Sequence, residues 1–132
     1  MIKGVIAGSF DVLHPGYIDM FNQASTQCDI LVVLLHDDPS IERPHKLKPI
    51  LSVLERTNML LALSSVDSIR TYKTEKDLYN ILLTSNYDIR FQGIDYQNKS
   101  FTGDDLNIPI KWITRDHGWS TTKFKKLIAE SL

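Results

Sequence analysis

The apolar positions of the chain gather in five short runs that are rich in β-branched residues. Such runs, bounded by turn residues, predict strands. The first two are apolar nearly throughout, which is typical of parallel strands buried on both faces. The five predicted strands are Ile2–Ala7, Asp29–Leu35, Val66–Tyr72, Ile89–Gln92 and Ile108–Ile113.

The stretches between and after these runs carry apolar residues at helical spacing. Ser52 and Glu55 form a capping-box pattern at the start of one stretch, and Ser120 is a candidate N-cap of another. Alternating strands and helices predict an α/β fold: a single Rossmann-like domain over residues 1–132, with a five-stranded parallel sheet and helices on both faces. The predicted helices are Pro15–Thr26, Ser52–Leu63, Glu75–Ser85 and Ser120–Glu130.

Composition narrows the class of protein without naming its activity. The hydrophobic fraction of 42% and the charged fraction of 23% are ordinary for a globular domain. A formal net charge of −1 argues against general nucleic-acid or anionic-membrane binding, and no apolar run reaches the ~18 residues of a membrane span. The single cysteine, Cys28, excludes an internal disulfide, and we expect it to fill the core. A cytoplasmic enzyme or binding protein is the expectation.

In open parallel sheets, ligands bind beyond the carboxyl ends of the strands. That rule directs attention to four loops, Gly8–His14, His36–Lys48, Gly93–Asn107 and Thr114–Thr122. The glycine-rich dinucleotide fingerprint and the Gly-x4-Gly-Lys phosphate loop are both absent. The spacing of the histidines matches no zinc template, so no metal ligands are predicted.

The first of these loops is suited to binding an anion. Gly8 and Ser9 allow close approach of the backbone, His14 offers a donor, and the next helix directs its N-terminal N–H groups to the same place. The sequence Gly8-Ser9-Phe10-Asp11 and the following His14-Pro15-Gly16 resemble the Gly-x-Phe-Asp and His-x-Gly-His motifs of cytidylyltransferase-type nucleotidyltransferases. Tyr17 stands where that family has its second histidine.

The last loop carries a second match. Residues 115–122 read Arg-Asp-His-Gly-Trp-Ser-Thr-Thr, which resembles the family's Arg-x-x-Gly-x-Ser-Thr-Thr motif at every fixed position. Ser120, Thr121 and Thr122 begin a predicted helix whose hydroxyl and N–H groups can hold phosphate oxygens, and Arg115 adds a bidentate donor. An N-cap with a surface arginine is the alternative interpretation.

Two weaker signals fit the same resemblance. Lys46 and Lys48 precede Glu55-Arg56 at a spacing similar to that of the family's lysine pair, which neutralises charge on the triphosphate. Asp95 lies in a turn that resembles the family's Gly-x-Asp turn next to the nucleotide. The alternatives are a solvated loop for the lysines and a turn carboxylate bonded to its own backbone for Asp95.

The resemblance extends over nearly the whole chain and is strongest to the small glycerol-3-phosphate cytidylyltransferases. It implies transfer of CMP from CTP to a small phosphorylated alcohol, with glycerol 3-phosphate as the first candidate and Mg²⁺ arriving with the triphosphate. It implies three sets of site residues: catalytic His14, Lys46 and Tyr17; nucleotide-binding Gly8, Ser9, Phe10, Lys48, Asp95, Arg115, Ser120, Thr121 and Thr122; and acceptor-binding Asp11, Asp38 and Arg56.

Tyr17 leaves three outcomes open, because tyrosine donates one hydrogen bond but cannot become cationic. The chain is a slower enzyme, an enzyme that uses Tyr17 for a different acceptor, or a nucleotide-binding protein without catalysis. An adenylyltransferase is a further alternative, because related adenylyltransferases share the fold and variants of both motifs. We further expect His14 and Lys46 to lie near solvent, and the family resemblance implies a homodimer.

Overall fold

The computed structural model describes all 132 residues and contains one five-stranded parallel sheet. The strand order is β3-β2-β1-β4-β5, so the chain moves outward from β1 in one direction and then crosses back to the other side. The strands are β1 (Lys3–Gly8), β2 (Ile30–His36), β3 (Ser68–Tyr72), β4 (Ile89–Gly93) and β5 (Ile110–Ile113). The predicted fold class and all five strands are confirmed.

Four α-helices follow the strands, with the predicted positions confirmed to within a residue or two. They are α1 (Pro15–Ser25), α2 (Val53–Leu61), α3 (Glu75–Thr84) and α4 (Thr121–Glu130), and a short 3₁₀ turn covers Ile94–Tyr96. The Ser52–Glu55 capping box is present, as is the Ser120 N-cap, whose hydroxyl accepts from the N–H of Lys123.

The core forms two layers, one on each face of the sheet. On one face, Phe21 and Ala24 of α1 and Leu60 of α2 pack on alternate residues of β1 and β2. On the other face, Leu78, Ile81 and Leu82 of α3 cover the intervening residues. Cys28 lies partly buried against the first layer, as predicted.

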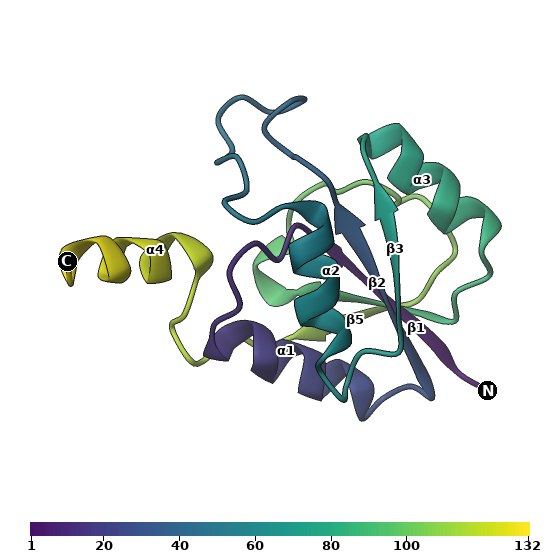
Figure 1. Cartoon of the computed structure of the whole chain (residues 1–132). Helices are drawn as coiled ribbons and strands as arrows, with labels where there is room; N and C mark the ends of the chain where they lie inside the picture. The colour runs from purple at the N-terminus through teal and green to yellow at the C-terminus, as the bar shows by residue number, and fades with distance from the viewer.

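Helix α4 differs from the other three because none of its residues is buried. It projects away from the sheet and ends at the C-terminus (Figure 1). Lys125 on α4 reaches back to the carboxylate of Asp11 at 2.7 Å, and this contact connects the helix to the first strand-to-helix turn. The helix therefore presents its N-terminus to the sheet edge while its body stays exposed.

Candidate active site

A cavity of about 790 Å³ runs along the carboxyl edge of the sheet. Residues at or just beyond the ends of all five strands line it, from Tyr72 at the end of β3 to Arg115 after β5. Ser9 and Thr121, which are more than a hundred residues apart in the sequence, both line it. The prediction that the first and last motifs lie at the same edge of the sheet is confirmed.

The turn after β1 is shaped by the backbone conformation of Phe10 and by the space that Gly8 leaves for its ring. Phe10 has a φ of 42°, in the left-handed region that bulky side chains rarely adopt. Its ring folds back so closely over Gly8 that a Cβ there would lie 2.9 Å from the ring. Phe10 is buried against Phe21 and Tyr17, and this packing stabilises the turn and leaves Ser9 facing the cavity.

His14 caps α1 and is buried, so the expectation that it lies near solvent was wrong. Its Nδ1 accepts a hydrogen bond from the N–H of Gly16 at 3.1 Å, and only its Nε2 is left for other partners. That atom lies 3.4 Å from Oγ1 of Thr121. Burial, and then the charges of His117 and Arg115, lower the pKa of His14. A neutral ring that donates from Nε2 is the state these contacts favour.

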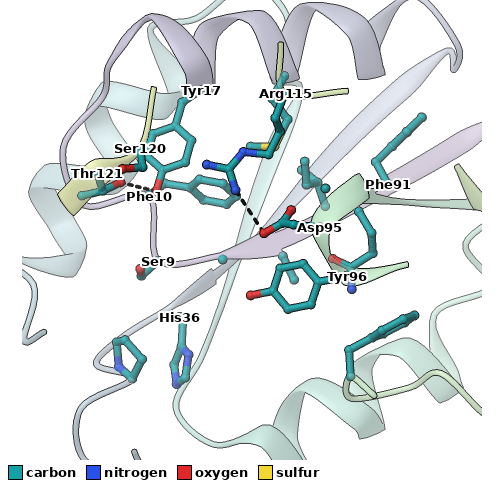
Figure 2. Close-up of a pocket in the computed structure, with 18 of the residues that line it drawn as sticks. Ser9, Phe10, Tyr17, His36, Phe91, Asp95, Tyr96, Arg115, Ser120 and Thr121 are labelled. Atoms are coloured by element: carbon teal, nitrogen blue, oxygen red, sulfur yellow. Dashed lines mark hydrogen bonds and ion pairs between the residues drawn. The ribbon is translucent and has the colours of Figure 1, made fainter. Parts of the chain in front are cut away.

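Tyr17 lies on the first turn of α1 and points into the cavity, as expected from its spacing from His14. Its ring stacks on His14 with centroids 4.1 Å apart, and its hydroxyl lies 2.5 Å from Oγ1 of Thr121. Burial is the main cause that raises the pKa of Tyr17, so the phenol stays protonated. Figure 2 shows Tyr17, Ser120 and Thr121 grouped at one end of the site.

Arg115 and Asp95 face each other across the β4–β5 side of the cavity (Figure 2). Their side chains form an ion pair of 3.1 Å, and Arg115 also donates to the carbonyl oxygen of Trp119. Gly93 makes this possible, because a Cβ there would lie 2.7 Å from Oδ1 of Asp95. Both side chains are about 40% exposed, so the pair can open to admit a ligand that offers its own donors and acceptors.

Of the other residues predicted to bind the nucleotide or its phosphates, some line the cavity and some do not. Ser120 lines the cavity together with Thr121, whereas Thr122 does not. Lys46 lines it from the exposed loop after β2, and its solvent exposure is as expected. Lys48 lies outside the cavity, close enough to Asp38 for its charge to help lower the pKa of that carboxylate, after the larger effect of the Ser40 hydroxyl.

The three predicted acceptor-binding residues, Asp11, Asp38 and Arg56, do not line the cavity. Asp38 bonds the N–H and hydroxyl of Ser40 within its own loop. Their part in acceptor binding is not supported by this placement and stays a prediction from resemblance only.

Asp11 and Arg56 are instead buried, and their side chains bond the backbone of the loops around the site. The Asp11 carboxylate accepts from the N–H groups of Ile50 and Leu51 at 2.8 and 2.9 Å and pairs with Lys125. Burial alone would raise the pKa of Asp11, but Lys125 and these N–H groups outweigh it and hold the pKa below its ordinary value.

Arg56 is 2% exposed and donates only to backbone carbonyls, namely those of Ser9, His36, Asp37 and Leu51. It therefore ties the ends of β1 and β2 to the loop that precedes α2.

The β2–β3 side of the cavity holds a polar group that the sequence interpretation missed. Arg43 pairs with Glu75, whose other oxygen accepts from the Thr102 hydroxyl at 2.8 Å. Arg90 of β4, 3% exposed, donates to the carbonyl oxygen of the same Thr102 and so adjoins this group. His36 also lines this side, stacked on Tyr72.

Two signals in the sequence pointed to these missed residues. Glu75 follows the third predicted strand, and the rule for carboxyl ends applies to that strand as well as to the others. Arg90 is a lone charge within an otherwise apolar strand run, which is a marker of a buried functional or structural cation. Arg43 lies within the loop that was singled out, but nothing in its local sequence distinguishes it from the neighbouring surface charges.

No group of three or more histidine, cysteine or acidic side chains is placed to hold a metal ion. No helix is both long and apolar enough to cross a membrane.

Comparison with known proteins gives the site a family context. A family model described as cytidylyltransferase-like matches residues 5–91. Relatives named "Bifunctional protein HldE" include that of Hyphomonas neptunium, 38% identical over 104 residues, which are 78% of this chain and 21% of that protein. The relative from Wolinella succinogenes is 33% identical over 125 residues, 94% of this chain and 26% of that protein. The chain thus spans about a fifth to a quarter of the length of these relatives.

Solved structures agree with the fold. The lipopolysaccharide core biosynthesis protein from Thermoplasma volcanium is similar with a TM-score of 0.68 and 26% identity, covering 87% of this chain and 96% of that one. Pantothenate synthetase from Thermus thermophilus has a TM-score of 0.60 at 15% identity, covering 86% of this chain and 55% of that one, and it supports the fold alone.

Proposed function

Because the chain belongs to the cytidylyltransferase-like family, we propose that it transfers a nucleotidyl group from a nucleoside triphosphate to a small phosphorylated alcohol. The observation that carries this proposal is the single cavity shared by Ser9, His14, Arg115 and Thr121. The residues come from two distant motifs, and both supply hydrogen-bond donors suited to phosphate oxygens. An ordinary strand–turn–helix with an unrelated N-cap would not bring them together.

In this reaction a phosphate oxygen of the acceptor attacks the α-phosphorus of the triphosphate. A new P–O bond forms as the bond to the bridging oxygen breaks, and pyrophosphate leaves with the electron pair. The protein supplies alignment and charge neutralisation rather than a covalent group. In this proposal Nε2 of His14, which is left free by the bond at Nδ1, donates to a phosphate oxygen, and Lys46 provides a cation from an exposed loop that lines the cavity. Mg²⁺ that accompanies the triphosphate would neutralise part of the charge on its phosphates.

The sheet topology supports a division of the cavity between the two substrates. Strand β1 lies at the centre, with β4 and β5 on one side and β2 and β3 on the other. We place the nucleoside on the β4–β5 side, where Asp95 can accept from a ribose or a base once its pair with Arg115 opens. The acceptor then occupies the β2–β3 side, where Arg43 suits its phosphate and Glu75 suits its hydroxyl groups. Arg90 of β4 lines the same cavity and adds a further positive charge.

Glycerol 3-phosphate with CTP is the first substrate pair to test. The HldE relatives are not named as cytidylyltransferases, so ATP is tested beside CTP, with adenylyl transfer as the second candidate. A non-catalytic nucleotide-binding protein is the third, because Tyr17 replaces a histidine and its hydroxyl is already bonded to Thr121.

The test is a pyrophosphate-release screen that crosses the four ribonucleoside triphosphates with phosphorylated polyols, sugars and amino alcohols. We expect release that depends on both a triphosphate and an acceptor and that falls at least a hundredfold in His14→Asn, which keeps an acceptor for the Gly16 N–H. Nucleotide binding without release by any pair would support the non-catalytic alternative. Neither binding nor release would contradict the proposed site.

A homodimer is part of the same proposal. The exposed apolar residues Leu127 and Ile128 on α4, both more than 40% accessible, support it. Sedimentation that shows only a 15.1 kDa species at working concentration would count against it.

A further inference from the structure

The loop between β5 and α4 carries an imidazole, that of His117, which neither motif assigns to the reaction. His117 occupies a variable position of the last motif, yet its side chain lines the cavity and is only partly exposed. It therefore needs an explanation beyond that of a surface loop residue.

Gly16 shows how close this ring lies to His14. A Cβ on Gly16 would lie 2.6 Å from Cε1 of His117 and 2.9 Å from Cε1 of His14. The two imidazoles thus meet at the same point, the backbone of the first turn of α1. Glycine at this position allows both rings to approach the N-terminus of that helix, where phosphate oxygens are favoured.

The hydrogen bonds of His117 repeat those of His14. Nδ1 of His117 accepts from the N–H of Trp119 at 2.9 Å, just as Nδ1 of His14 accepts from the N–H of Gly16 at 3.1 Å. In both rings the backbone bond occupies Nδ1, and the proton of the neutral ring is therefore on Nε2. The site consequently holds two matched Nε2–H donors that come from opposite ends of the chain.

Tyr17 cannot supply a second imidazole. Its hydroxyl is paired with Oγ1 of Thr121 at 2.5 Å, and its ring stacks on that of His14. A phenol also stays uncharged at neutral pH, whereas an imidazole can become cationic as negative charge develops on a leaving pyrophosphate.

We propose that His117 is a second phosphate-binding catalytic residue, which donates from Nε2 to the triphosphate beside His14 and supplies the imidazole that position 17 lacks. This inference rests on the proposed nucleotidyl transfer and deepens it. In this account the chain retains two imidazoles at the phosphate site, but the second comes from the last motif instead of the first.

Electrostatics agree with this geometry. After burial, the charge of His117 is the largest cause that lowers the pKa of His14, followed by that of Arg115. Lys123, whose ammonium donates to the carbonyl oxygen of Gly118 at 3.4 Å, adds a further cation to the same loop, while Asp116 adds an anion. The positive charges of Arg115 and Lys123 favour a polyanion at this loop.

A structural role for His117 is the competing explanation, because Nδ1 also holds the turn at Trp119. The variant His117→Asn separates the two roles: its amide oxygen replaces Nδ1 as the acceptor for the Trp119 N–H, and no donor reaches the position of Nε2. His117→Gln tests the opposite case. Its longer side chain can bring a neutral N–H donor to the position of Nε2, but it does not place an acceptor next to the Trp119 N–H. Asp116→Asn is the matched control in the same loop.

The experiment measures kcat for the active substrate pair, the Tm and the NMR titration of His14. We expect His117→Asn to keep the Tm within about 2 °C of wild type, to lose roughly a hundredfold in kcat and to raise the pKa of His14. His117→Gln should retain more activity than His117→Asn, and Asp116→Asn should keep kcat within about threefold of wild type. A kcat for His117→Asn within about threefold of wild type, an unchanged pKa of His14, or a parallel loss of kcat and Tm would each overturn the proposal.

Failure of the proposed reaction is distinguishable from failure of this inference. If wild type shows no turnover with any substrate pair, calorimetry with inorganic tripolyphosphate decides. Affinity weakened at least tenfold in His117→Asn but not in Asp116→Asn then supports a phosphate-binding His117. Equal affinity in wild type and His117→Asn overturns it.

Discussion

Replacement of Arg56 by methionine is expected to destabilise the fold strongly rather than to weaken acceptor binding. Arg56 is 2% exposed and its guanidinium donates to the carbonyls of Ser9, His36, Asp37 and Leu51. Methionine fills much of the same volume but donates nothing, so four backbone acceptors, one of them buried and three partly buried, lose their donor at once.

The magnitude follows from the number and type of these bonds. A hydrogen bond from a charged group contributes about 1.5–3 kcal/mol, and relaxation with entry of water recovers part of the loss. Removing one side of a buried charged network typically costs about 3–5 kcal/mol, and we expect a loss in that range. For a domain of 132 residues such a loss lowers the Tm by roughly 11–18 °C, at about 2.1 cal/mol/K of unfolding entropy per residue.

Urea denaturation followed by circular dichroism provides the assay, with Arg70→Met as the control. Arg70 lies on β3 and donates only to the Ser85 hydroxyl, a contact at the surface, so its replacement should change stability by less than about 0.5 kcal/mol. Equal stabilities of Arg56→Met and wild type, together with a raised KM for the acceptor, would refute the reasoning and restore the acceptor-binding role predicted from sequence.

The remaining predictions concern the cavity. Lys46→Met should leave the Tm within about 2 °C of wild type, because the side chain is exposed, and should lower kcat at least tenfold in the pyrophosphate assay, because its proposed role is to neutralise charge on the triphosphate; an unchanged kcat would remove it from the site. Gly16→Ala should lower both kcat and the Tm, because its Cβ would lie 2.6 Å from His117 and 2.9 Å from His14; full activity would show that the two rings do not meet there. Tyr17→Phe should lower the Tm by a few degrees through loss of the bond to Thr121, and Tyr17→His should raise transfer if a further cation is accommodated; identical Tm and kcat in all three forms would show that position 17 has no chemical role. Because the pKa of His14 is lowered in the folded state, the unfolded chain binds this proton at a higher pH than the folded chain does. Stability should therefore fall as the pH drops below about 6.5 and through the folded pKa. If the urea midpoint falls equally in His14→Asn, the effect belongs to other groups.

The fold was predictable because the sequence pattern is locally consistent. Continuous apolar runs, a capping box at Ser52 and an N-cap at Ser120 each fix one element without help from distant residues. Because ligands of open parallel sheets bind beyond the carboxyl ends of the strands, the two motifs were expected at one site. The positions of individual side chains at that site could not be predicted.

The errors concern side chains whose role depends on packing from distant elements. His14 was expected to be a solvent-exposed donor, but Tyr17, Trp119 and Phe124 cover it from two helices and a loop. Arg56 resembled an acceptor ligand from its motif, yet its partners are backbone carbonyls that no residue pattern reveals.

The subsite formed by Arg43, Glu75 and Arg90 was also missed, because it assembles three elements that are separate in the sequence. His117 could not be distinguished from a surface histidine for the same reason. Only the structure shows that its ring lies beside that of His14, in the space left by Gly16.

The most direct test of nucleotidyl transfer follows the label from each phosphate of the active triphosphate. With label at the α-phosphorus, wild type should produce a labelled acceptor product and unlabelled pyrophosphate. With label at the γ-phosphorus, all released label should appear in pyrophosphate. Transfer of the γ-label to the acceptor, or its release as inorganic phosphate, would contradict the account, because it would show a kinase or a hydrolase in the cavity at the edge of this sheet.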